Sequence, residues 1–228
     1  MRGSLLSISL FLTIPVAALA LDKGDPQPPS TLGAKPPAGA VVLLGHEGAG
    51  AWIGSDGKGP VNWHLADGIL TVGHGDIKTE KTFGDFELHL EFNVPYMPNA
   101  RGQARGNSGV YLAGNHELQV LDSYGLPTES HECGAIYSQV APCVNACKPP
   151  LQWQTYDVTF HKARVEEGKV VKKARVTVLQ NGVKIIDDAE IVPTPGGLGN
   201  AEGTDGPLLL QDHGNKVQYR NIWIKPLG

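Results

Sequence analysis

The chain has 228 residues, of which 19 are Lys or Arg and 23 are Asp or Glu, so its formal net charge is −4. This acidic balance, with no basic cluster interleaved with aromatic residues, excludes an ordinary nucleic-acid-binding surface. The high content of Gly (29) and Pro (17) indicates many tight turns and few helices.

Residues 1–20 have the pattern of a secretion signal. Arg2 supplies the positive charge, residues 5–16 are apolar, and residues 18–20 (Ala-Leu-Ala) offer small side chains for cleavage. The apolar run is shorter than the ~20 residues that a membrane-spanning helix needs, so we expect no stable membrane insertion. The sequence therefore predicts a periplasmic or secreted protein that has lost residues 1–20.

Residues 21–39 are rich in proline and carry almost no large apolar side chains. Five prolines interrupt this segment, at positions 26, 28, 29, 36 and 37. Such a composition predicts a disordered, exposed and extended tether. The remaining residues, 40–228, are of a suitable length for one catalytic domain with a substantial core.

Short segments of alternating or apolar character follow one another through this domain. They predict strands at residues 68–72, 86–94, 108–112, 117–121, 155–160, 174–180, 183–187, 207–213 and 217–225. Asn181-Gly182 between two of them predicts a type I′ hairpin, because both residues tolerate positive φ. No long amphipathic helix competes, so we expect an all-β, jelly-roll β-sandwich of two antiparallel sheets.

The segment 86–94 shows the alternation most clearly. Its apolar side chains should point to the core and its polar ones to solvent. The core-facing set is Phe86, Leu88, Leu90 and Phe92, and the solvent-facing set is Glu87, His89 and Glu91.

A polar strand near the middle of the chain gives the first candidate site. Glu117 and Gln119 share one face because side chains alternate with period two. Asp122 falls out of phase, and a single β-bulge after Val120 would return it to that face. Asn107 precedes the neighbouring strand. For Glu117 the plain alternative is a solvated strand charge.

A second polar segment lies near the C-terminus. Gln211 and His213 share a face of the strand predicted at 207–213, whereas Asp212 points the other way and suits a supporting or turn role. A histidine beside a Gly-Asn turn is more often structural than catalytic. Trp153 either fills the core or stacks on a sugar ring.

Three cysteines, Cys133, Cys143 and Cys147, allow one disulfide and one remaining thiol. Their spacing does not suggest structural zinc. Pairing of Cys133 with Cys147 is our preferred arrangement, and three reduced thiols are the alternative.

Several separate motifs, in order along the chain, resemble the 3-keto-disaccharide hydrolase family. The motifs are Gly84–Leu88, Asn107–Tyr111, Glu117–Ser123, Cys133–Tyr137, Trp153–Tyr156, Leu210–Gly214 and Arg220–Ile222. The resemblance implies a concanavalin-like jelly roll that acts on 3-keto-glycosides as a 3-keto-glucoside 1,2-lyase, a 3-keto-2-hydroxy-glucal hydratase, or both. It also implies an upstream sugar 3-oxidoreductase that supplies the ketone.

This chemistry needs a base at C2, a stabiliser for the enolate and an acid for the leaving group. The candidates are His213 or Glu117 as base, Asp122 as its partner, and Asn107, Gln119 and Gln211 as binders of hydroxyls and the keto oxygen. Glu117, Asp122 and His213 could also hold a divalent metal ion, although no spacing establishes a cofactor.

Two other functions remain open from the sequence. A conventional glycoside hydrolase would use Glu117 and Asp122 as paired carboxylates. The spacing resembles the E-x-D-x-x-E strand of lectin-like glycosidases, from which Gln119 and Asp122 depart. A carbohydrate-binding module would keep Trp153 and the amides and would not need Glu117 and His213 together.

Overall fold

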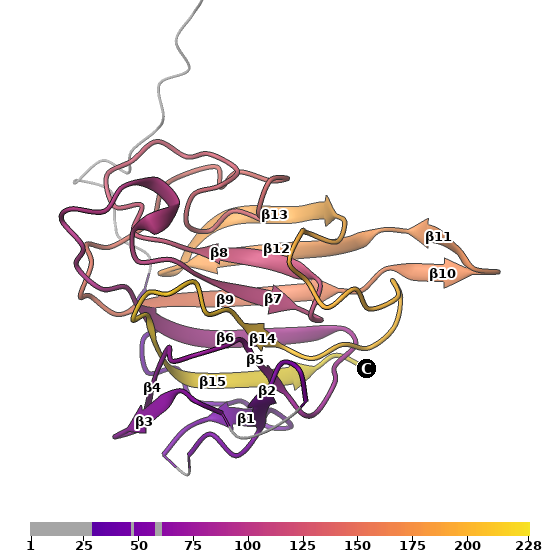
Figure 1. Ribbon diagram of the computed structural model, residues 1–228. Coiled ribbons are helices and arrows are strands. Elements are labelled where there is room, and N and C mark those ends of the chain that lie inside the picture. Colours follow the sequence, from indigo (N-terminus) through magenta and orange to yellow (C-terminus); the bar gives the residue numbers. More distant parts are fainter. Residues whose placement is uncertain (1–28, 47, 58–60) are drawn as a thin grey trace, which may run out of the picture.

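The computed structural model describes residues 29–46, 48–57 and 61–228, which form a jelly-roll sandwich of two antiparallel sheets (Figure 1). The fold class is the predicted one. The proposed signal at 1–20 and the tether residues 21–28 lie outside the described residues. No helix in the described part of the chain is long and apolar enough to cross a lipid bilayer.

The larger sheet has eight strands in the order β13-β12-β9-β6-β15-β4-β3, with β1 also paired to β15. Its strands are β1 (Val41–Leu44), β3 (His64–Ala66), β4 (Ile69–Thr71), β6 (Phe86–Asn93), β9 (Gln154–His161), β12 (Ala174–Gln180), β13 (Val183–Ile191) and β15 (Gln218–Pro226).

The smaller sheet has five strands in the order β2-β5-β14-β7-β8. In Figure 1 it lies in front of the larger sheet. Its strands are β2 (Trp52–Gly54), β5 (Ile77–Thr79), β7 (Ser108–Leu112), β8 (His116–Val120) and β14 (Leu209–Leu210). A separate hairpin, β10 (Arg164–Glu166) with β11 (Lys169–Lys172), extends from one end, and a short 3-10 helix, η1 (Gly102–Ala104), precedes β7.

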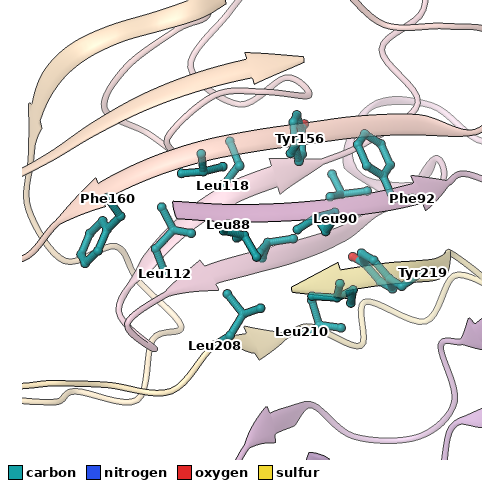
Figure 2. Close-up of a cluster of buried hydrophobic side chains, with 14 of the residues drawn as sticks. Leu88, Leu90, Phe92, Leu112, Leu118, Tyr156, Phe160, Leu208, Leu210 and Tyr219 are labelled. Atoms are coloured by element: carbon teal, nitrogen blue, oxygen red, sulfur yellow. The ribbon is translucent and has the colours of Figure 1, made fainter. Parts of the chain in front are cut away.

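The core lies between the two sheets. Figure 2 shows Leu88, Leu90 and Phe92 of β6 among side chains from the smaller sheet, such as Leu112 and Leu118. All of these side chains are fully or almost fully buried. Burial of apolar surface is the dominant favourable contribution to the stability of such a sandwich. The predicted inward set of β6 is therefore confirmed.

The hairpin at Asn181-Gly182 is also confirmed. Both residues have positive φ, 53° and 83°, and they connect β12 to β13 through the pair Gln180↔Val183. The three-residue strands β2, β3 and β5 escaped prediction because so few residues carry no readable alternation.

Two side chains of β6 that were predicted to face solvent, His89 and Glu91, are buried. His89 and Glu91 are only 0% and 1% exposed. His89 Nδ1 lies 2.6 Å from Asp157 Oδ1, and Arg220 Nε donates to Glu91 Oε2 at 2.6 Å. Burial alone would raise the pKa of Glu91, but the hydrogen bonds it accepts outweigh burial and hold that pKa near 2.

Residues 29–39 lie along this polar face and bond to it, so the predicted disorder is wrong for this part, although most of these residues are exposed as predicted. Thr31 Oγ1 donates to Asp157 Oδ2 at 2.7 Å and lies 2.6 Å from Thr155 Oγ1. Gly33 N–H donates to Glu91 Oε1 at 2.6 Å. Prolines suit such a segment because an extended chain can dock through side chains and isolated N–H groups without a strand ladder.

The contribution of this docking can be measured with Thr31→Val, which keeps the side-chain shape and removes the hydroxyl. We expect a loss of about 1 kcal/mol in the free energy of unfolding, because Asp157 loses a donor. Denaturant unfolding checks it. Ser30→Ala is the matched control, since among the described residues the Ser30 hydroxyl accepts only the exposed Leu32 N–H, and its loss should change little. Equal effects of the two variants would contradict the docking role.

Candidate active site

The candidate site lies on the face of the smaller sheet that points away from the core. In the pairing of β7 with β8, Tyr111 is opposite Glu117 and Gly109 is opposite Gln119. The intervening pair, Val110 with Leu118, is buried in the core. Glu117 and Gln119 therefore share one face, as the alternation predicts.

Glu117 is the carboxylate at the centre of this face. It is 4% exposed, and the Tyr111 hydroxyl donates to its Oε2 at 3.0 Å. Gln211 Nε2 donates in turn to the Tyr111 hydroxyl at 3.3 Å. Burial raises the pKa of Glu117 to about 7, the Tyr111 hydrogen bond opposes this rise, and the charge of Asp76 adds to it. Glu117 therefore exchanges a proton near neutral pH.

Tyr111 was not among the predicted site residues. Burial and the charge of Glu117 raise its pKa, so the phenol stays protonated and acts as a donor. Its position directly opposite Glu117 on the paired strand could have indicated it, once the register of β7 and β8 was known.

Gly109 provides the space that the Glu117 carboxylate occupies. A Cβ atom at position 109 would lie 2.6 Å from Glu117 Oε1, closer than non-bonded atoms approach. The glycine of the Asn107–Tyr111 motif is thus explained by a close approach of a side chain.

Asp76 is a second carboxylate that the sequence analysis missed, because the short strand β5 that follows it was not predicted. Its Oδ1 accepts the Asp212 N–H at 2.8 Å. Burial raises the pKa of Asp76, and the charges of Asp212 and His213 act on it in opposite directions. Asp76 therefore lies within electrostatic reach of both Glu117 and His213.

His213 is not on a strand. The strand predicted at 207–213 is only Leu209–Leu210, and His213 is exposed in the loop that follows. The Gln211 N–H still pairs with Gly109 O at 3.0 Å, which keeps Gln211 beside β7. Asp212 accepts from the N–H groups of Gly75 and Gly214, which confirms its turn role.

An amide network occupies the other end of the face. Gln103 Oε1 accepts from Asn107 Nδ2 at 3.1 Å and from Gln119 Nε2 at 3.0 Å, while Gln103 Nε2 donates to His131 O at 2.9 Å. The side-chain oxygens of Asn107, Gln119 and Gln211 are buried and have no partner among the described residues. They need donors, which ordered water or hydroxyl groups can supply.

Asp122 does not join Glu117. The β7–β8 register runs without a bulge to Ser108↔Val120, where β8 ends. The Asp122 N–H then donates to Arg105 O, and its carboxylate lies 3.5 Å from Arg105 Nε. The predicted bulge is wrong, because the chain leaves the sheet and Asp122 pairs with a cation instead.

The metal set Glu117, Asp122 and His213 is likewise not assembled. The residues that the structure describes contain no group of three His, Cys, Asp or Glu side chains that could hold a metal ion. These three residues therefore do not form the predicted metal site, because each has different neighbours: Glu117 bonds to Tyr111, Asp122 pairs with Arg105, and His213 lies in an exposed loop.

Trp153 lies on the opposite side of the sandwich. The Arg220 guanidinium is 4.0 Å from the centre of its ring, and Arg220 pairs with Glu91 on the outer face of the larger sheet. A ring covered by Arg220 on that sheet cannot stack on a sugar bound at Glu117, so Trp153 does not join the predicted site.

Residues 39–225 match the model of the 3-keto-alpha-glucoside-1,2-lyase-like domain. The chain belongs to this family. It is 24% identical over 240 residues to the 3-keto-disaccharide hydrolase of Bacteroides thetaiotaomicron, an alignment that covers 83% of this chain and 79% of that protein.

Solved structures agree with this assignment. One, from Parabacteroides distasonis and described as a candidate glycosyl hydrolase, is 37% identical with a TM-score of 0.77, covering 84% of this chain and 85% of that one. A second from the same organism is 22% identical with a TM-score of 0.61, covering 83% and 94%, and shows the shared fold. The chain is a carbohydrate-active enzyme.

The space around the Glu117 carboxylate can be tested with Gly109→Ala. The added methyl group should displace Glu117 from Tyr111 and cost about 1–3 kcal/mol of stability, as overpacking does. Thermal or denaturant unfolding measures this cost. Gly50→Ala is the control, because a Cβ there meets nothing within 4 Å. An alanine tolerated equally at both positions would contradict the close approach.

Proposed function

We propose that the enzyme cleaves 3-keto-glycosides by removing the C2 proton and eliminating the group at C1, and that it hydrates the resulting 3-keto-2-hydroxy-glucal. The observation that carries the proposal is the buried Glu117 carboxylate, bonded to Tyr111, with a pKa of about 7. General bases work best when their pKa lies near the working pH. The family membership supports the same substrate class.

In the proposed first step, the Glu117 carboxylate removes the proton from C2 of the sugar. The bonding electrons form the enolate on the C3 oxygen, and their return forms the C1=C2 double bond as the C1–oxygen bond breaks. The leaving oxygen takes a proton, for which the exposed imidazole of His213, near Asp76, is the candidate donor. Addition of water across C1=C2 then completes net hydrolysis.

The polar groups around Glu117 suit the binding of a hydroxyl-rich ligand. Tyr111 keeps the carboxylate in place. The unpartnered oxygens of Asn107, Gln119 and Gln211 match the hydroxyl donors of a sugar, either directly or through ordered water. This assignment keeps the amide roles expected from the sequence.

A conventional glycoside hydrolase is the second candidate, and Asp76 is the observation that favours it. Its charge acts on Glu117, so two carboxylates lie on the same face. In that mechanism Glu117, protonated near neutral pH, would act as the acid and Asp76 as the base or nucleophile.

The two candidates predict opposite pH profiles. If Glu117 is a base, kcat/KM for a 3-keto-glucoside should rise with pH through a midpoint near 7, because only the ionised carboxyl removes a proton. Glu117→Gln should lower turnover ~100- to 10,000-fold, the typical cost of a lost base. Solvent deuterium should enter C2 of recovered substrate. Activity that falls above pH 7, on the unoxidised glucoside and without exchange at C2, would favour the hydrolase.

Tyr111→Phe tests the role of the phenol. Its hydrogen bond lowers the pKa of Glu117, so its loss should move the midpoint of the pH profile upward while activity at high pH is largely kept. Tyr124→Phe is the matched control, since Tyr124 is 54% exposed. A midpoint that stays in place in Tyr111→Phe would show that Glu117 does not control the profile.

We further propose that the enzyme is exported to the periplasm or secreted after loss of residues 1–20, and that a sugar 3-oxidoreductase supplies its substrate. The leader pattern supports the first point and the family supports the second. Mass spectrometry of exported protein should find a start at Leu21, and an intact Met1 would refute the cleavage.

A further inference from the structure

Two of the three cysteines meet in the core beside β8. Gln180 Nε2 lies 3.6 Å from Cys133 Sγ and 3.4 Å from Cys147 Sγ, so one amide group contacts both sulfurs. Cys143 is exposed, and its Sγ lies 3.5 Å from Lys184 O. All three are thiols in the structure.

The segment that carries Cys133 is bonded to the candidate active-site strand. Gly134 N–H donates to Gln119 O at 3.0 Å, and Gln119 N–H donates to Ala135 O at 2.9 Å. The Tyr156 hydroxyl donates to Gln119 O at 2.7 Å and lies 3.1 Å from Cys133 Sγ. The Tyr156 hydroxyl therefore links the sulfur of Cys133 to the backbone carbonyl of Gln119.

We infer that Cys133 and Cys147 are a redox pair that forms a disulfide, closing the loop 133–147 against β8 and leaving Cys143 as the free thiol. The two thiols lose two protons and two electrons, and one S–S bond forms. The electrons pass to the disulfide of a thiol-exchange oxidant, such as glutathione disulfide, which leaves as two thiols.

The surroundings of the two sulfurs indicate the order of the steps. Cys147 is partly exposed and Cys133 is buried, so Cys147 meets the oxidant and forms the mixed disulfide, releasing one oxidant thiol. Cys133 Sγ contacts the same Gln180 amide group as Cys147 Sγ, so Cys133 is placed to attack the mixed disulfide. The Cys133 thiolate then attacks the sulfur of Cys147 and releases the second oxidant thiol.

The disulfide should stabilise the fold by restricting the unfolded chain, since it closes a loop. It also holds the Cys133–Ala135 backbone beside Gln119. We expect the oxidised protein to unfold at a temperature about 5–10 °C above that of the reduced protein.

The experiment treats the purified full-length chain with glutathione disulfide under native conditions and then counts thiols after denaturation. At most one thiol per chain is expected after oxidation, because the exposed Cys143 can itself take up glutathione, and three are expected after reduction. The bridge lowers the intact mass by about 2 Da, apart from any glutathione carried by Cys143. Peptide mapping should link Cys133 to Cys147. Three thiols after oxidation, or a bridge that includes Cys143, would overturn the inference.

Two variants separate the pair from the third cysteine. Cys143→Ser should keep the bridge, leave no free thiol after oxidation and retain the temperature shift. Cys147→Ala should form no bridge at Cys133, with an unfolding temperature that does not respond to reductant. The wild-type thiol count decides the matter even if Cys147→Ala fails to fold, and a Cys143→Ser protein that cannot form the bridge would overturn the assignment.

Discussion

The pairing of β7 with β8 is the interaction on which the core and the candidate site both depend. In each strand, alternate side chains point to opposite faces, so the pair Val110↔Leu118 packs into the sandwich while Tyr111↔Glu117 faces outward. A shift of one residue would exchange these sets and bury the carboxylate in the core. The apolar packing therefore fixes the register that brings the phenol to the carboxylate.

The depth of Glu117 explains how a carboxyl group becomes suited to chemistry near neutral pH. The neighbouring strand supplies a hydroxyl donor, which favours the ionised form, while burial and the charge of Asp76 favour the protonated form. Gly109 leaves room for the carboxylate at this depth. The balance of these effects, and not the residue type alone, distinguishes Glu117 from Glu91, whose pKa is held near 2 by its hydrogen bonds.

The larger sheet shows the same residue types in a different role. Its outer face carries His89, Glu91 and Arg220, which a reader of the sequence could assign to a second site. Residues 29–39 cover that face and satisfy its polar groups. Buried charges that are paired and hydrogen-bonded in this way belong to the structure of the sheet.

The sequence by itself determined the all-β class, most of the longer strands, the Asn181-Gly182 hairpin, the family, and the shared face of Glu117 and Gln119. Each follows from local patterns, such as side-chain alternation or the backbone freedom of a turn, or from motifs in order. Only the tertiary structure decided the partners of these residues. Asp76 within electrostatic reach of Glu117 and His213, and Trp153 under Arg220, depend on contacts between segments distant in the chain. Tyr111 opposite Glu117 and Asp122 at Arg105 depend on the register of the β7–β8 pair and on where it ends. Strand register and sheet packing set those contacts, and no local pattern encodes them.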